Sequence, residues 1–165
     1  MPIRGTFLLP STVTKTLVCI DTIQPAEFRG RFYNIYLPNY VEFNGAFDLV
    51  NKMDHIFDDF RFPHAYFDCR SFHPSGSEPS GAALPKKPAC YQDETIFTQE
   101  KGEKVTLLLQ VLTRQHATWQ GMAFCVEKGY SVSFQSIREL MHFILDSFSA
   151  SDSKLKLANW GKKSR

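Results

Sequence analysis

The chain has 165 residues, a hydrophobic fraction of 43% and a formal net charge of +2. This length suffices for one compact domain or for two small packed units. The near-neutral charge excludes a chain that is basic throughout. Its apolar runs are shorter than the roughly 18 residues that mark a membrane-spanning helix.

The second half of the chain repeats the first at a spacing of 91 residues. Phe28 corresponds to Trp119, so aromatic character is kept at that position. Several other positions are identical in both copies, namely Leu17 and Leu108, Thr22 and Thr113, Gln24 and Gln115, Gly30 and Gly121, Val41 and Val132, and Phe43 and Phe134. The repeat predicts an internally duplicated fold.

Hydrophobic periodicity predicts the elements of each copy. In the first copy, we expect a strand over 16–23, a turn at 28–30, a return strand over 31–37, a short strand at 41–43 and a helix over about 44–60. The second copy repeats this order with strands near 105–112, 122–126 and 130–134, and a helix that begins at Ser136. A capping box formed by Ser136 and Glu139 supports that start.

Between the copies, residues 65–72 could add a strand, and the Pro-, Gly- and Ser-rich stretch that follows is typical of a linker or long loop. We predict an α+β fold of duplicated βββα units, with a mostly antiparallel sheet of six or seven strands and two helices packed on one face. Two separate lobes joined by the linker are the alternative. The predicted units are 1–72, 73–95 as the linker, 96–150 and a basic tail over 151–165.

Two surface features favour partner binding. The outer face of the first helix is acidic, with Asp54, Asp58 and Asp59, and such a face can steer association with a basic partner. The turn of the second copy carries Arg114, His116 and Trp119, which is the composition of a binding hot spot. Because Phe28 takes the place of Trp119 in the first copy, a structural role for that ring is the favoured alternative.

Metal and cofactor motifs are weak in this chain. The one zinc-like set is His64, Cys69, His73 and Cys90, whose spacing matches no standard zinc site. We therefore predict no metal and no cofactor. The four cysteines form no CxxC pair, and Cys19 and Cys125 lie within apolar strand patterns, which favours a reducing cytoplasm.

The end of the chain offers an alternative function. Its excess of positive charge could contact phosphate, through the five basic residues Lys154, Lys156, Lys162, Lys163 and Arg165. Direct nucleic-acid binding through this tail and the Arg114–Trp119 turn is therefore the competing hypothesis. A solvated terminus is the simpler reading of the same residues.

Three stretches resemble segments of small proteins encoded by bacterial mobile elements and their hosts. They read RQHATWQG at 114–121, SFQSIRELMHFIL at 133–145 and FDLVNKMDHIFDDFRFPHAYFDCRSF at 47–72. The resemblance implies a bacterial or phage-related setting and carries no catalytic residues. Small proteins of that setting often bind a host nucleoprotein, and inhibitors of CRISPR nucleases are one example.

The sequence therefore predicts a non-catalytic protein-binding module that docks on a nucleic-acid-processing complex through loops and a sheet face. The chain contains no nucleophile elbow, phosphate-binding glycine loop or His-Glu metal motif. An enzyme of another type stays open as the third hypothesis, which would need a deep pocket that joins a histidine to a carboxylate.

Overall fold

A computed structural model of the chain describes residues 11–24, 27–63 and 88–148. Its first half consists of the 3-10 helix η1 (Ser11–Thr14), β1 (Lys15–Gln24), β2 (Glu27–Tyr33), β3 (Val41–Asn44) and α1 (Ala46–Phe60). Its second half consists of the short helix α2 (Ile96–Gln99), β4 (Val105–Thr113), β5 (Gln120–Cys125), β6 (Tyr130–Phe134) and α3 (Ile137–Phe148).

The six strands form one sheet in the order β3-β2-β1-β4-β5-β6, and every neighbouring pair is antiparallel. The predicted α+β class and antiparallel sheet are confirmed. A continuous sheet also shows that the strands do not form two separate lobes. Its central pair joins the two halves, with Leu17 of β1 directly opposite Leu108 of β4.

The strand pairing on one side of this centre matches the pairing on the other. Ile20 pairs with Gly30 in the first half, and Val111 pairs with Gly121 in the second, 91 residues later. Both ladders shift register directly after these pairs, at Ile20/Thr22 and at Val111/Thr113. Such a shift marks a β-bulge, which increases local twist and bends the strand.

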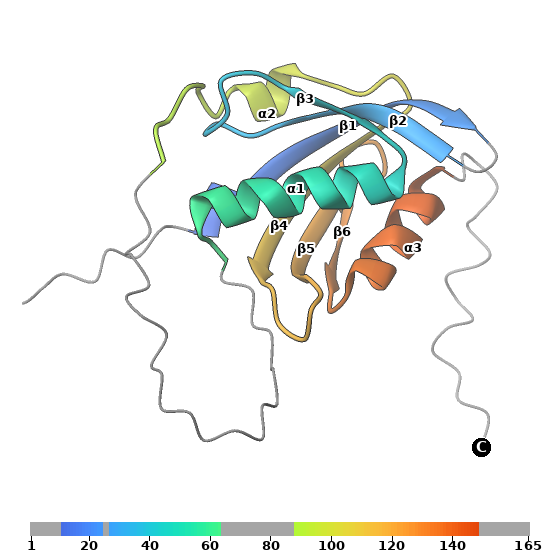
Figure 1. Ribbon diagram of the computed structural model, residues 1–165. Helices are drawn as coiled ribbons and strands as arrows, with labels where there is room; N and C mark the ends of the chain where they lie inside the picture. The colour runs from blue at the N-terminus through green and yellow to red at the C-terminus, as the bar shows by residue number, and fades with distance from the viewer. Residues whose placement is uncertain (1–10, 25–26, 64–87, 149–165) are drawn as a thin grey trace, which may run out of the picture.

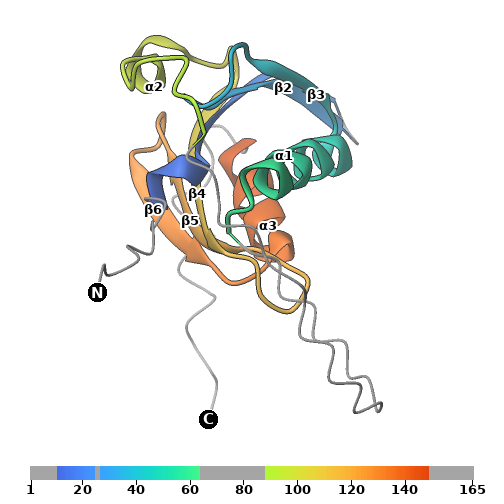
Figure 2. The same cartoon turned by 60° about the vertical axis from the view of Figure 1, so that its left-hand side comes forward.

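The sheet curves around α1 and α3, whereas α2 lies outside the curve (Figures 1 and 2). Buried side chains of both long helices join those of the strands in one apolar cluster, including Leu49 and Phe57 of α1 and Leu140 and Ile144 of α3. The strands contribute the residues that alternate toward this side, because successive side chains of a strand point to opposite faces. The core therefore lies between the concave face of the sheet and the two helices.

Each long helix begins against the edge strand that precedes it. The backbone N–H of Asn44, at the end of β3, donates to Asp48 Oδ2 at 2.9 Å. In the second half, the N–H of Gln135 donates to Glu139 Oε2 at 2.7 Å, and the N–H of Glu139 donates to Ser136 Oγ at 3.2 Å. A carboxylate in the first helical turn thus satisfies a backbone donor and complements the helix dipole.

Some predicted boundaries are wrong. Phe28–Gly30, expected in a turn, belong to β2, which begins at Glu27 after β1 ends at Gln24. The sequence also did not predict α2, which lies at the start of the unit 96–150 expected to be the second copy. The possible strand at 65–72 lies outside the described residues. Within the described part of the chain, no helix is long and apolar enough to cross a membrane.

Candidate functional site

The turn between β4 and β5 is fastened to α1 by a buried arginine. The side chain of Arg114 donates to the Pro63 carbonyl oxygen at 2.7 Å, to Asp58 Oδ1 at 2.8 Å and to Asp54 Oδ1 at 3.1 Å. The indole Nε1 of Trp119 donates to the same Asp54 oxygen at 2.8 Å. Arg114 is only 6% exposed, so its charge is held mainly by protein partners.

Aromatic contacts complete this cluster. The rings of Phe57 and Trp119 meet edge to face with centroids 5.6 Å apart, and the Arg114 guanidinium lies 5.8 Å from the Phe57 centroid. We call these six residues the Arg114 cluster: Asp54, Phe57, Asp58, Pro63, Arg114 and Trp119. The structure therefore brings together four of the six predicted docking residues, but it does so to join the β4–β5 turn to α1.

The remaining two predicted docking residues, Asp59 and His116, are exposed and do not belong to the Arg114 cluster. Asp54 and Asp58 each form an ion pair with Arg114. Reversing their charge would therefore break this internal contact as well as change any binding of a partner. An acidic docking face on α1 is consequently smaller than the sequence suggests.

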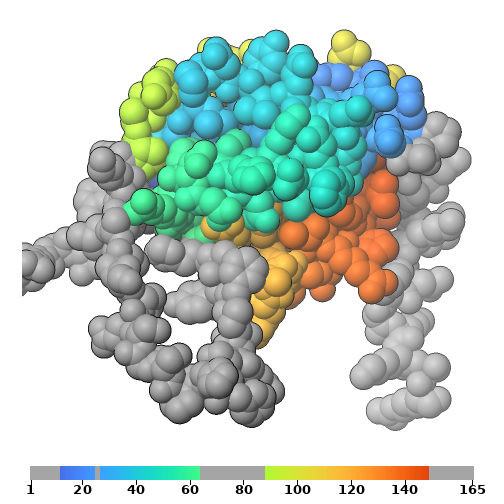
Figure 3. All heavy atoms as spheres, viewed as in Figure 1, coloured from blue at the N-terminus to red at the C-terminus, as the bar shows by residue number. Residues whose placement is uncertain are grey.

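The tip of the β4–β5 hairpin has an unusual backbone. His116 and Ala117 have φ values of 55° and 56°, and the N–H of Thr118 donates to the Gln115 carbonyl oxygen at 3.1 Å. Two consecutive left-handed residues are the pattern of a type I′ turn, which normally prefers Asn-Gly. Figure 3 shows this hairpin emerging beyond the surface of α1.

We expect Ala117→Gly to stabilise the domain by about 0.5–1 kcal/mol, because glycine removes the steric cost that a Cβ adds at positive φ. Urea denaturation would measure the change. Ala123→Gly is the matched control: it lies buried within β5, where glycine weakens a strand, and should lower stability. A loss of stability in Ala117→Gly would contradict the assigned turn.

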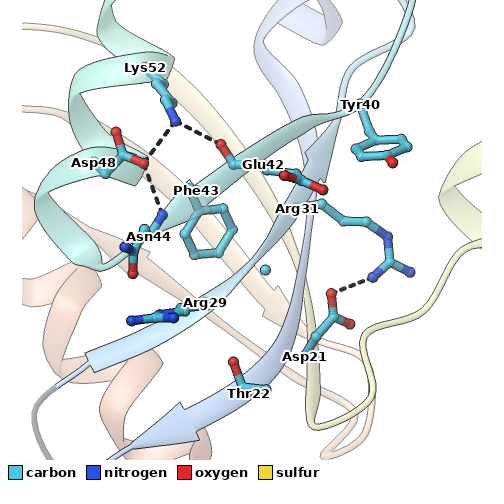
Figure 4. A pocket seen from close by; sticks show the side chains of 11 residues that line it. Asp21, Thr22, Arg29, Arg31, Tyr40, Glu42, Phe43, Asn44, Asp48 and Lys52 are labelled. Atoms are coloured by element: carbon cyan, nitrogen blue, oxygen red, sulfur yellow. Dashed lines mark hydrogen bonds and ion pairs between the residues drawn. The ribbon is translucent and has the colours of Figure 1, made fainter.

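A polar groove of about 690 Å³ lies beside β2, β3 and the start of α1. Figure 4 shows its two ends, where Lys52 contacts Asp48 and Arg31 contacts Asp21. The hydrogen bond from Lys52 lowers the pKa of Asp48 below its ordinary value. Arg29, the third cation of the groove, lies 3.7 Å from Glu27. Three cationic and three carboxylate side chains line the groove, so it presents no excess of one sign to a ligand.

On the convex face of the sheet, α2 and the residues after it cover the first half. Ile96 and Phe97 pack against Leu17, Cys19 and Tyr33, all of which are buried. Burial raises the pKa of the Cys19 thiol to about 12, so it stays protonated and unreactive at neutral pH.

Polar contacts hold this covering segment in place. The Nε of Arg31 donates to the Tyr33 hydroxyl at 2.7 Å, and that hydroxyl donates to Glu100 Oε2 at 3.1 Å. Arg31 also donates to the Lys101 carbonyl oxygen at 3.2 Å. The bonds to Tyr33 and Asp21 raise the pKa of Arg31, which keeps its full charge.

Among the described residues, the corresponding side chains of β5 are more exposed. Arg31 and Tyr33 correspond to Met122 and Phe124, which are 47% and 36% exposed, whereas Tyr33 is 7% exposed. We call this area the β4–β5 face, formed by the exposed apolar residues Leu112, Met122, Phe124 and Val126. Large exposed apolar patches mark interaction sites.

Sequence reasoning missed the β4–β5 face because β5 is apolar on both sides. The residues that point to the core are small, namely Gly121, Ala123 and Cys125, while the large Met122 and Phe124 point outward. Hydrophobic alternation therefore gave no sign of which side was buried. The size difference between the two sides was the available signal, since small residues in a strand allow helices to pack closely.

The other predicted sites cannot be assembled from the described residues. His64, Cys69, His73 and the whole basic tail lie outside them, and Cys90 is exposed, with its thiol 3.2 Å from the Gln92 carbonyl oxygen. Among residues 11–24, 27–63 and 88–148, no three His, Cys, Asp or Glu side chains are placed to hold a metal ion.

The β4–β5 face is thus an exposed apolar surface on the convex side of the described sheet. No protein-family model matches the chain. Comparison with curated proteins and with solved structures likewise finds no match.

Proposed function

We propose that this chain is a non-catalytic protein-binding module that docks on its partner through the β4–β5 face. The observation that carries the proposal is the contrast between the two halves of the convex surface. Leu17 and Tyr33 are buried beneath α2, whereas Phe124, the counterpart of Tyr33, is 36% exposed, although its neighbour Leu108 on β4 packs against the same cluster as α2.

The chemistry of the β4–β5 face suits a protein partner. Aromatic residues and methionine are enriched in protein interfaces, and Phe124 and Met122 supply both kinds near the centre of the face. The neighbouring outward residues of β6, Ser131 and Ser133, are small and polar, so they can form a rim. Nothing in this face offers the positive charge that a phosphate backbone requires.

The same scaffold supports a wider proposal about origin. Matching registers, bulges and helix starts, all 91 residues apart, favour an internally duplicated βββα unit with both long helices on one face. In this account the two halves have diverged on the convex side, where one face is covered by the chain and the other is kept for a partner.

The resemblance to mobile-element proteins indicates which partners to test first. We propose an inhibitor-like role on a host nucleic-acid-processing complex, in a reducing cytoplasm. The free, buried thiols of Cys19 and Cys125 are consistent with such a compartment.

The test is affinity capture from the native host lysate, with and without nuclease. We expect the Met122→Ser/Phe124→Ser variant to lose the partner that the natural sequence captures. Its stability should fall by no more than about 1 kcal/mol, because both side chains are partly exposed. The matched control is Phe47→Ser on α1, an aromatic side chain that is 85% exposed and far from β5 in sequence.

The proposal would be contradicted if Met122→Ser/Phe124→Ser still captured the partner and Phe47→Ser did not. That result would place the interface on the helical side. Capture that disappears with nuclease, or on deletion of residues 151–165, would instead favour direct nucleic-acid binding through the basic tail.

A further inference from the structure

The edge of the sheet formed by β3 is capped by side chains of α1. Lys52 donates to the Glu42 carbonyl oxygen at 2.9 Å, and Asp48 accepts the backbone N–H of Asn44 (Figure 4). These contacts occupy two of the backbone groups that β3 directs away from β2. Placing lysine at an edge strand is one of the ways in which native sheets avoid pairing with other chains.

At the opposite edge, formed by β6, α3 makes only one of these contacts. Glu139 accepts the N–H of Gln135, which corresponds to the contact made by Asp48. The position that corresponds to Lys52 holds Phe143, a buried ring with no group that can donate to the strand. The sequence of α3 contains no lysine, so this helix offers β6 no equivalent of the cap on β3.

The backbone of β6 directs the groups of alternate residues away from β5. The N–H of Gln135 points toward α3, and the directions of N–H and C=O alternate along a strand. Ser133 and Ser131 lie two and four residues earlier, so their backbone groups point the same way as that N–H. Each serine therefore presents a donor and an acceptor at the edge. On the convex side, these serines stand opposite Met122 and Phe124 of the β4–β5 face.

The short side chains of the two serines leave the outer flank of the β4–β5 face accessible. Ser131 and Ser133 are exposed, and Met122 and Phe124 beside them are also exposed. A strand added at β6 would lie roughly 10 Å from β5, because neighbouring strands are about 4.8 Å apart. Large side chains on that strand would extend over the serines and bury Met122 and Phe124.

We infer that β6 accepts an extended segment of the partner, which joins the six-stranded sheet as a further strand and packs large apolar side chains on the β4–β5 face. This inference rests on the proposed function and defines the chemistry of the partner, a strand whose alternate residues are large and apolar. In such recognition, main-chain hydrogen bonds supply affinity and alternate side chains supply specificity. A second copy of the chain fits less well, because two paired β6 strands would place serines opposite serines on the convex side.

The pairing can be measured on the full chain by amide hydrogen exchange. The probe is the acetylated peptide Lys-Thr-Phe-Thr-Val-Thr-Val-Lys, in which apolar residues alternate, and the control peptide has the same composition with those residues contiguous. At millimolar concentration, we expect the alternating peptide to slow exchange of the Ser131 and Ser133 amides severalfold. The Glu42 amide, which occupies the corresponding place on β3, should keep its rate, and the control peptide should have no effect.

Unchanged exchange of both serine amides, or equal slowing at Glu42, would overturn the inference. Shifts of the Met122 and Phe124 resonances without slowing of the serine amides would also overturn it, because the peptide would then dock without pairing. Slow exchange that needs no peptide would do the same, whether it is lost on dilution or on deletion of residues 151–165. Those two results would identify a second copy or the C-terminal segment as the occupant.

Substitutions on β6 test the same contact. Ser133→Pro removes one outward N–H and leaves the β5–β6 ladder complete, and edge strands tolerate proline at such positions. It should abolish both the slowing at Ser131 by the peptide and the capture of the partner, whereas Glu42→Pro on β3 should retain both. If proline unfolds the domain, Ser133→Lys serves instead, because it places a charge among the apolar side chains of the added strand. Ser133→Thr is its control and should bind normally.

Two combinations of results separate this inference from the proposed function. If Met122→Ser/Phe124→Ser loses the partner while Ser133→Pro and Ser133→Lys keep it, the β4–β5 face docks without strand addition and the inference is wrong. If all these variants capture the partner while the peptide slows the serine amides of the natural chain, β6 accepts a strand and the proposed docking function is wrong.

Discussion

Gly30→Ala and Gly121→Ala are each expected to destabilise the domain by more than about 3 kcal/mol, enough to unfold a marginal protein. A Cβ at Gly30 would lie 1.9 Å from the Cys19 carbonyl oxygen, and one at Gly121 would lie 2.1 Å from that of Gln110. Both obstacles are backbone atoms of a neighbouring central strand, so relief requires the strands to separate. Circular dichroism and urea denaturation of the two variants would measure the loss.

The control for this prediction is Gly129→Ala. Gly129 has a φ of 65° but no atom within 4 Å of an added Cβ, so its replacement costs only the left-handed backbone strain, about 1 kcal/mol. If Gly30→Ala and Gly121→Ala were no worse than this control, the close strand approach would be wrong. A large loss at only one of them would contradict the correspondence of the two halves.

Arg114→Met should destabilise the domain by about 2–3 kcal/mol. Removing one partner of a buried ion pair leaves the others uncompensated, at a typical cost of 3–5 kcal/mol. We expect about a third less because water still reaches the carboxylates, which are 44% exposed in Asp54 and 61% in Asp58. The Pro63 carbonyl oxygen would lose its donor as well.

Lys52→Met is the matched control, because Lys52 also joins α1 to a strand, through a hydrogen bond to the Glu42 carbonyl oxygen of β3, and pairs with Asp48, but is 41% exposed. It should cost no more than about 1 kcal/mol. Chemical denaturation of both variants gives the comparison. Equal losses of unfolding free energy in the two variants would show that Arg114 does not stabilise the packing of α1 on the β4–β5 turn. Arg114 would then again be a candidate for partner binding.

Sequence patterns predicted the type of the six strands and of the two long helices, because their apolar residues recur at strand or helix spacing. The β2 boundary was misplaced because Phe28 and Gly30 look like turn residues. In the structure, Phe28 is a core residue, and Gly30 is required by the approach of β1. A single sequence does not distinguish a glycine that permits a turn from one that permits a close strand.

The candidate site was less predictable than the fold. From a sequence alone, charged residues such as Arg114, Asp54 and Asp58 are expected on the surface. In the structure Arg114 binds both aspartates, and this contact exists only because α1 packs on the β4–β5 turn. The β4–β5 face depends on another tertiary contact: α2 packs on Leu17 and Tyr33 of the first half, and in the described residues of the second half only Leu108 packs against that cluster.

The most direct measurement is site-specific photo-crosslinking in the native host, with the photoreactive residue at position 122 or, for comparison, at exposed position 55 on α1. We predict a discrete protein adduct from position 122 that resists nuclease, and none from position 55. An adduct from position 55 alone, or a nucleic-acid adduct from position 122, would contradict the assignment of the β4–β5 face as a protein-docking surface.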